Sequence, residues 1–311
     1  MTPTLDGTVD RTINMRRAIG QGSVSGHFGE IIQGSFRDPD GAIVRALVTL
    51  RCPLFQAWAL FELTSDTEVT IEPSYCVKAK RAAEDTLAYV GLLGQGGRLH
   101  IKSNAPIGIG AGSSTGDVVA AIRAVNEACR AGLTPMEVAR LAVDTETAID
   151  PIMLRASPEV LFTYRNGTVL ERFSRCLPSV RVLGFTDGQP VDTVNHPPAR
   201  YDRVQIAEFE ELRNRLRQAI DRADTADIGR IATRSAEINQ AYLPKPSWLL
   251  LRDIVRDAGA IGLAVSHSGS AVALLFDPRP DRSDVGMARA RHRLDEAGIC
   301  RRWHFLAGGS S

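Results

Sequence analysis

The sequence predicts an α+β protein built in two lobes, and three observations support this. Strand-like and helix-like segments are mixed along the 311 residues. These segments lack the regular strand–helix alternation that is typical of a parallel α/β sheet. A strand-like segment begins at Ser179, and long helical patterns follow it. We therefore expect an N-terminal domain at residues 1–178 and a C-terminal domain at residues 179–311.

The composition is ordinary for a soluble globular protein, with 44% hydrophobic and 23% charged residues. The 37 basic and 36 acidic residues nearly cancel, so there is no electrostatic reason to expect nucleic acid or an anionic membrane as partner. The five cysteines have no metal-binding spacing, which indicates reduced thiols. No apolar run approaches the ~18 residues of a membrane span, and residues 1–17 lack the apolar segment of a secretory signal. We expect a cytoplasmic protein.

The first hundred residues or so are expected to be rich in strands. Residues 18–34 are glycine-rich and predict strand fragments joined by tight turns. Residues 42–63 are rich in β-branched and aromatic side chains, and residues 68–73 alternate, so both predict strands. Residues 79–94 have the apolar spacing of a helix, and residues 97–106 predict a strand.

Two helices and a hairpin are expected next. Residues 117–131 predict a helix, whose buried stripe consists of Val118, Ala121, Ile122, Val125 and Cys129. Thr134, Pro135 and Glu137 form the capping box and first turn of a second helix. Residues 159–173 predict a hairpin that turns at Asn166-Gly167.

The C-terminal domain is expected to alternate between the two kinds of element. Residues 179–187 predict a strand. Helical patterns occupy residues 203–223, 225–243 and 246–259. Residues 260–278 predict a strand, a turn of small residues and a second strand.

Gly108, Gly110 and Gly112 stand directly before three hydroxyl residues and a helical pattern. Glycines let backbone N–H groups approach a ligand closely, and a helix that begins there adds its free N–H groups and positive dipole end. Phosphate suits that combination. No Lys follows the last glycine as in a Walker loop, and the spacing differs from the dinucleotide fingerprint. A flexible capped turn is the alternative.

Four segments in the expected order resemble the GHMP kinase superfamily, over residues 26–277. "PIGIGAGSST" from Pro106 is similar to its phosphate loop. "GEIIQG" from Gly29, "SAEINQAYLPKP" from Ser235 and "GLAVSHSGSAVALLFD" from Gly262 resemble segments of the L-threonine kinase branch, which serves cobalamin synthesis and propanediol utilisation. The resemblance implies a ribosomal S5 domain 2-like N-terminal lobe, a ferredoxin-like C-terminal lobe, and a cleft between them where ATP meets the acceptor.

The resemblance also implies phosphoryl transfer with ATP and Mg²⁺ as cofactors. The residues that would hold the ATP phosphates are Pro106, Gly108, Gly110, Gly112, Ser113, Ser114 and Thr115. Ser114 and Glu146 would bind Mg²⁺, which prefers hard oxygen ligands, and Asp150 would orient or deprotonate the acceptor hydroxyl. Glu146 and Asp150 could share a helix face at i,i+4, whereas Asp144 and Glu146 could not. A solvated acidic helix end is the alternative.

The acceptor site implied by the resemblance draws on residues far apart in the sequence. Glu30 could receive an ammonium group, Gln33 could add an amide contact, and Lys245 could hold a phosphate or a carboxylate. The remaining candidates to contact the acceptor are His27, His267, Ser268 and Gly269. The alternatives are an exposed strand-end charge at Glu30, an exposed loop lysine and a tight hairpin.

Two places depart from the L-threonine kinase pattern. His27-Phe28 stand where that branch tends to have Ser-Cys, and Pro151 follows Asp150. We expect an ATP-dependent kinase that phosphorylates the side-chain hydroxyl of an amino acid, with L-threonine as the first candidate. The alternatives are another hydroxylated amino acid or specialised metabolite as acceptor, and a catalytically inactive metabolite sensor. The pathway and the oligomeric state, a homodimer included, stay open.

Overall fold

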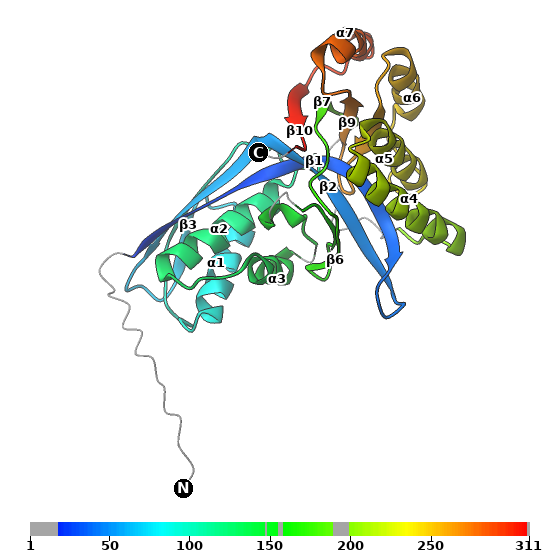
Figure 1. The fold of residues 1–311 in the computed structure, drawn as a ribbon. Coiled ribbons are helices and arrows are strands. Elements are labelled where there is room, and N and C mark those ends of the chain that lie inside the picture. Colours follow the sequence, from blue (N-terminus) through cyan, green and yellow to red (C-terminus); the bar gives the residue numbers. More distant parts are fainter. Residues whose placement is uncertain (1–17, 147, 155–157, 189–198, 310–311) are drawn as a thin grey trace.

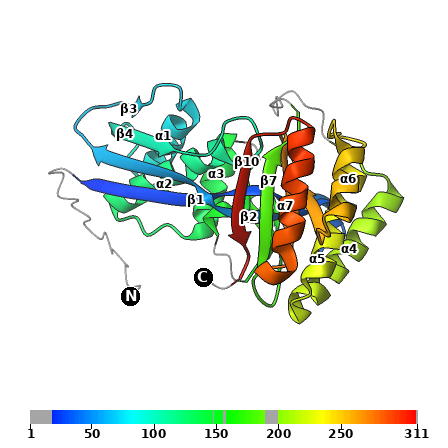
Figure 2. The same ribbon diagram turned by 90° about the horizontal axis from the view of Figure 1, so that it is seen from above.

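The computed structural model describes residues 18–146, 148–154, 158–188 and 199–309 (Figure 1). Ten strands form one mixed sheet, whose main path runs β10-β7-β9-β8-β1-β2-β4-β3, with β5 and β6 off that path. Helices α1 to α3 lie on one side of the long strands, and α4 to α7 gather at the other end of the sheet (Figure 1 and Figure 2). Mixed sheet and helices of this kind confirm the α+β prediction.

The long antiparallel strands β1 (Ile19–Arg37) and β2 (Ile43–Leu63) form the centre of the sheet. The prediction of short fragments joined by turns was wrong for residues 18–34, because β1 is continuous. Its glycines instead allow close packing against α2 and a local irregularity in the strand. A Cβ on Gly22 would lie 2.0 Å from the backbone oxygen of Ala120 in α2, and Gly29 has a φ of +86° where the strand register shifts.

The elements that pack on this end of the sheet largely follow the predictions. They are β3 (Val69–Glu72), α1 (Val77–Tyr89), β4 (Gly97–Ser103), α2 (Ser113–Cys129) and α3 (Pro135–Glu146). All five residues of the predicted apolar stripe of α2 are buried. The helix begins at Ser113, however, four residues before the predicted start, so its first turn lies directly behind the glycines.

Local turn chemistry was also predicted correctly here. The Thr134 hydroxyl accepts a hydrogen bond from the Glu137 N–H at 3.3 Å, and the Glu137 carboxylate accepts one from the Thr134 N–H at 2.8 Å. The hairpin of β5 (Val160–Thr163) and β6 (Thr168–Arg172) turns at Asn166-Gly167. Its strand β5 pairs with β2 at Leu47.

The C-terminal elements complete the sheet and cover it. They are β7 (Val180–Thr186), α4 (Arg203–Arg222), α5 (Thr225–Asn239), α6 (Trp248–Asp257), β8 (Gly262–Val265), β9 (Ala271–Phe276), α7 (Pro280–Glu296) and β10 (Arg302–Ala307). The sequence did not lead us to expect α7 or β10. Only four residues of α7 are buried, which leaves it a weak apolar stripe.

A shared core joins the two ends of the molecule. Phe28 in β1 is fully buried, and its ring centroid lies 5.9 Å from that of Phe55 in β2 and 5.4 Å from that of Trp303 in β10. Aromatic pairs at this separation stabilise by their contact as well as by burial. The long strands therefore contribute to both lobes, and the boundary at residues 178 and 179 stays a prediction. In the described part of the chain, no helix is both long and apolar enough to cross a membrane.

Candidate active site

The glycine loop, residues 106–115, has a backbone that only glycine adopts easily. Gly108, Gly110 and Gly112 have φ angles of +79°, +79° and +69°, in the region that side chains disfavour. The loop runs straight into α2 at Ser113, with Gly112 as its N-cap. The free N–H groups and positive dipole end of α2 therefore lie at the loop, which is the arrangement that binds anions.

The loop packs closely against the turn at residues 266–270, between β8 and β9. A Cβ on Gly110 would lie 1.9 Å from the carbonyl oxygen of Ser268, and one on Gly269 would lie 2.3 Å from the carbonyl carbon of Ile109. The Ala271 N–H donates to the Ile109 oxygen at 2.9 Å. These contacts bring the motif from Pro106 and the motif from Gly262 together. The candidate site therefore combines residues from both predicted domains.

Glu146, at the end of α3, reaches the first turn of α2. The hydroxyl of Ser114 donates to one carboxylate oxygen of Glu146, and the hydroxyl of Thr115 donates to the other at 2.7 Å. The Lys78 ammonium lies 3.2 Å from the same carboxylate. The structure thus brings Ser114 and Glu146 together directly behind the glycine loop. Hydroxyl and carboxylate oxygens are the ligands that Mg²⁺ accepts, so this pair fits the ion.

Asp150 lies apart from Glu146. The prediction that both carboxylates share a helix face was wrong, because α3 ends at Glu146 and Asp150 is extended, with φ −85° and ψ 151°. Proline disfavours the helical conformation in the residue before it, and Pro151 follows Asp150 and begins a 3₁₀ helix, η1 (Pro151–Met153). The two carboxylates therefore reach different neighbours.

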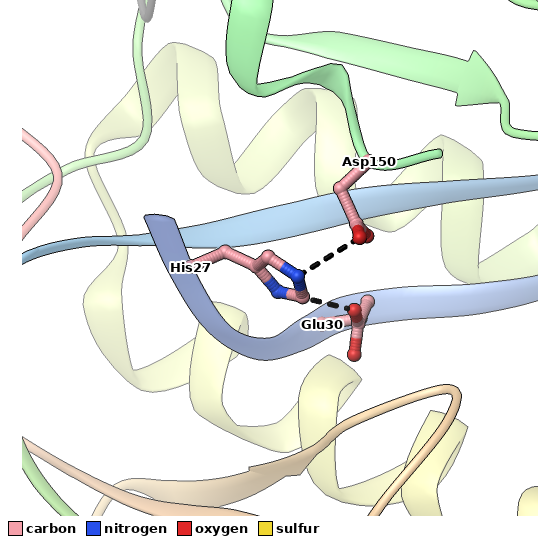
Figure 3. A group of neighbouring side chains, drawn as sticks. All are labelled: His27, Glu30 and Asp150. Carbon is pink, nitrogen blue, oxygen red and sulfur yellow. Dashed lines mark ion pairs between the residues drawn. The ribbon is translucent and has the colours of Figure 1, made fainter. Parts of the chain in front are cut away.

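The Asp150 carboxylate lies in a group of buried side chains. Figure 3 shows it together with His27 and Glu30. Its Oδ2 atom lies 2.8 Å from Nε2 of His27, and Nδ1 of His27 lies 3.6 Å from Oε1 of Glu30. All three residues are at most 4% exposed. Both contacts are ion pairs when the imidazole of His27 is protonated.

His267 from the 266–270 turn joins this group. Its backbone N–H donates to Oε2 of Glu30 at 3.0 Å, and its Nδ1 lies 3.1 Å from Oε1 of Glu30 and 3.7 Å from Oδ1 of Asp150. We call His27, Glu30, Asp150 and His267 the charged cluster. One ligand atom from each of the first three lies within 4.8 Å of the others, so they also have the donor atoms of a metal site.

Protonation of the two histidines balances the two carboxylates. Burial disfavours charge on His267, but Asp150 and Glu30 outweigh it and raise the pKa of His267 to about 9. The pKa of His27 is also raised, since Asp150 and Glu30 outweigh its burial. Burial opposes ionisation of Asp150, yet His27 and His267 hold the pKa of this carboxyl below its ordinary value. Asp150 is therefore ionised at neutral pH.

Lys245, from the segment before α6, is buried as well. It is 4% exposed, and its ammonium donates to the carbonyl oxygen of Gly269 at 2.5 Å. Burial lowers the pKa of Lys245 to about 8, against the raising effect of Asp187 and Glu30. The alternatives of an exposed loop lysine at position 245 and an exposed charge at Glu30 were therefore wrong.

The other predicted acceptor residues lie around the charged cluster. Gln33 is 6% exposed, and its side-chain amide donates to the Val265 oxygen at 3.2 Å, so it ties β1 to β8. Its contact with an acceptor stays a prediction. Lys78 and Asp187 were not among the predicted site residues. Nothing in their own segments marks them, because only the fold brings them to Glu146 and Lys245.

Two family models match the chain. The model described as GHMP kinases N terminal domain matches residues 75–153, and the one described as GHMP kinases C terminal matches residues 216–293. The first match includes the glycine loop, Glu146 and Asp150. The second runs from the last two turns of α4 into α7, with Lys245 and His267 between its ends. The two matches follow each other in the order expected from the motifs.

Known relatives agree with these matches. The chain is 28% identical to an L-threonine kinase of Salmonella typhimurium over 211 residues. The aligned region covers 66% of this chain and 67% of the relative. It is 27% identical over 264 residues to an L-threonine kinase of Citrobacter freundii, covering 83% and 85%. The crystal structure of a homoserine kinase from Cytophaga hutchinsonii is similar, with a TM-score of 0.68, 16% identity and coverage of 93% and 94%.

The fold, the glycine loop at the start of α2 and the collinear motifs agree with both family models. The chain belongs to the GHMP kinase superfamily and is similar to its L-threonine kinases.

Proposed function

We propose that this protein is an ATP- and Mg²⁺-dependent kinase that phosphorylates the side-chain hydroxyl of an amino acid, with L-threonine as the first candidate. The contact of Glu146 with Ser114 and Thr115 carries this proposal. Carboxylate and hydroxyl oxygens, which Mg²⁺ prefers as ligands, lie together there at the helix start beside the loop that suits phosphate. Membership of the GHMP kinases supports ATP as the donor, and the two curated L-threonine kinases support the acceptor.

Phosphoryl transfer depends mainly on positioning and on neutralising charge. The loop backbone from Gly108 to Thr115 would hold the phosphates of ATP against the start of α2. Ser114 and Glu146 would hold Mg²⁺, which neutralises charge on the phosphate oxygens when bound. Lys78 would keep the Glu146 carboxylate oriented toward α2 through its 3.2 Å contact.

Asp150 is the proposed partner of the acceptor hydroxyl. Its Oδ1 atom is buried and has no hydrogen-bond partner among the described residues, so it is free to accept one from a hydroxyl. As the new bond to the γ-phosphorus forms and the bond to ADP breaks, the hydroxyl proton would move to Asp150. His27 and His267 would keep Asp150 ionised and in place, so that it can orient the hydroxyl and accept its proton as the transfer completes.

Glu30 is the proposed partner of the acceptor's amine. Both of its oxygens contact His267, but a carboxylate has about four lone-pair sites, which leaves room for an ammonium group. His27 and Pro151, which depart from the L-threonine kinase pattern, both lie at Asp150. This observation favours another hydroxylated amino acid as the second candidate.

An assay of ADP release tests the proposal. L-Threonine, L-serine and L-homoserine would each be offered with ATP and Mg²⁺, beside the amine-free analogue 3-hydroxybutyrate. We expect turnover of at least one amino acid and none of the analogue, because the analogue lacks the ammonium group that would hydrogen-bond to Glu30. Equal turnover of 3-hydroxybutyrate would remove the role of Glu30. ATP binding without ADP release from any acceptor would favour an inactive sensor.

A further inference from the structure

A small pocket opens on the C-terminal side of the 266–270 turn. It has a volume of about 150 Å³, and residues 187–188, 243–246 and 269–270 line it. Gly269 belongs both to this pocket and to the tight contact with the glycine loop at Ile109 and Gly110. A ligand in the pocket would therefore lie next to the loop that we assign to the phosphates of ATP.

Two polar groups in the wall of this pocket have unused hydrogen-bonding capacity. The ammonium of Lys245 has three donors, and its one hydrogen-bond acceptor in the described part of the chain is the Gly269 oxygen. The hydroxyl of Ser270 is buried, at 2% exposed, and has no partner among the described residues. A buried hydroxyl without a partner is unfavourable, so a ligand that hydrogen-bonds to it would be favoured.

The charges around Lys245 indicate what kind of ligand fits. Among the described residues that line the pocket, Lys245 is the one cation, and the Asp187 carboxylate lies in the same wall. Asp187 accepts a hydrogen bond from the Ser247 N–H at 3.0 Å, which fixes it there. Any anion here lies near Asp187 as well as Lys245, so a phosphate would bring two negative charges against one ammonium, and an ammonium ligand would meet Lys245. A carboxylate carries a single charge and two acceptor oxygens, which matches one ammonium and one hydroxyl.

We propose that Lys245 and Ser270 form the subsite that binds the carboxylate of the acceptor. This inference rests on the proposed function, because it takes the acceptor to lie beside the glycine loop. It makes an α-amino acid, with its amine at Glu30 and its carboxylate at Lys245, the substrate class that the site selects. The pKa of Lys245, near 8, keeps the ammonium mostly charged at neutral pH, as the subsite requires.

The test compares an amino acid with its amino alcohol, which lacks only the carboxylate. Binding of L-threonine and L-threoninol would be measured by calorimetry with ADP and Mg²⁺ present, together with ADP release when ATP replaces ADP. L-Serine and L-homoserine, with their amino alcohols, extend the panel. The variants are Lys245→Met and Ser270→Ala. The matched control is Lys80→Met, which removes a lysine from the surface of α1.

We expect wild-type protein to bind the amino acid about 10- to 100-fold more tightly than the amino alcohol, the range for hydrogen bonds to charged groups. Lys245→Met should remove most of that difference and leave binding of the amino alcohol within about threefold, and Ser270→Ala should remove a smaller part. Lys80→Met should change neither. Thermal melting would check that each variant folds. If Lys245→Met does not fold, the loss of discrimination in Ser270→Ala tests the subsite.

Several results would overturn the subsite. They are equal binding of acid and alcohol by the wild type, equal weakening of both by Lys245→Met, and no binding of any amino acid in the panel. Discrimination by binding without ADP release would leave the subsite standing and count against the kinase proposal. The two proposals therefore fail separately.

Discussion

The glycine loop and the charged cluster are neighbours, and the ring of His27 lies between them. A Cβ on Gly112 would come within 2.5 Å of that ring, and the same ring lies 2.8 Å from Asp150 on its other side. The loop is built from ten consecutive residues and presents mainly backbone. The cluster is built from side chains on β1, on the residue before η1 and on the 266–270 turn. Its carboxylates and imidazoles neutralise one another.

This difference predicts two kinds of sensitivity. A backbone site depends on glycine conformations, so a single added side chain should damage it whatever its charge. A site of buried, paired charges tolerates no change of charge, because each removed partner leaves another charge uncompensated. A substitution that adds a side chain should therefore damage the glycine loop and spare the charged cluster. A substitution that only removes a charge should do the opposite.

The largest effect is expected from Gly110→Val. The valine would need a φ of +79°, and its Cβ would lie 1.9 Å from the Ser268 oxygen, so the loop and the 266–270 turn could not keep their contact. We expect loss of measurable ATP binding by calorimetry. The matched control is Gly132→Val, where φ is +71° but nothing lies within 4 Å. Unchanged ATP affinity in folded Gly110→Val would show that the loop does not hold the nucleotide.

Asp150→Asn keeps the shape of the side chain and removes its charge. Loss of one positioned general base typically lowers the rate by about 10²- to 10⁴-fold, and we expect kcat to fall in that range. ATP affinity should stay within about threefold, because Asp150 belongs to the cluster and not to the loop. A fall in kcat of less than about tenfold in steady-state assays would make Asp150 a structural residue.

The same contrast explains how much of the site could be predicted from the sequence. The glycine loop is contiguous, and its motif contains both the glycines and the hydroxyls, so the local sequence contains the information that places it. The capping box at Thr134 and the Asn166-Gly167 turn were predicted for the same reason. Their geometry depends on residues no more than a few positions apart.

The charged cluster could be predicted only as a set of separate candidates. Its residues come from β1, from the flank of η1 and from the 266–270 turn, and their pairing depends on the sheet that brings β1 next to β8 at Glu30 and Val265. The relation between Glu146 and Asp150 was misjudged, because a helical spacing was extended across a proline that ends it. The lengths of β1 and β2 likewise depend on packing against both ends of the molecule.

Glu146→Gln should affect the metal and not the nucleotide loop itself. The amide keeps the size of the side chain but is a neutral and weaker ligand. Groups that only support a metal ligand are worth about 10- to 100-fold in metal affinity, so loss of a direct ligand should raise the Mg²⁺ concentration for half-maximal activity at least tenfold. Asp144→Asn, two residues earlier on α3 and exposed, is the control. An unchanged Mg²⁺ requirement in Glu146→Gln would assign the ion to other ligands.

The last effect is expected on stability and not on activity, from His267→Gln, and it depends on pH. The pKa of His267 is raised to about 9 in the folded protein, because the Asp150 and Glu30 carboxylates outweigh burial and the repulsion from Arg165. A raised pKa means that the folded state holds the proton more tightly than the unfolded state. The stabilisation is therefore complete below pH 6.5, the ordinary pKa of histidine, and is lost as the pH rises to about 9.

Urea unfolding of wild type and His267→Gln at several pH values measures this. We expect the wild type to be more stable by up to about 3.5 kcal/mol below pH 6.5, because the pKa rises from 6.5 to about 9 and each unit represents ~1.4 kcal/mol. The difference should shrink steadily to pH 9. Lys245, whose pKa is lowered to about 8, adds stability as the pH rises above that value, but it is present in both proteins and cancels in the difference. A difference that does not change between pH 6 and pH 9 would mean that His267 is not protonated in the cluster. Asp150 would then owe its ionisation to His27 alone, and the acceptor side would depend on one imidazolium in place of two.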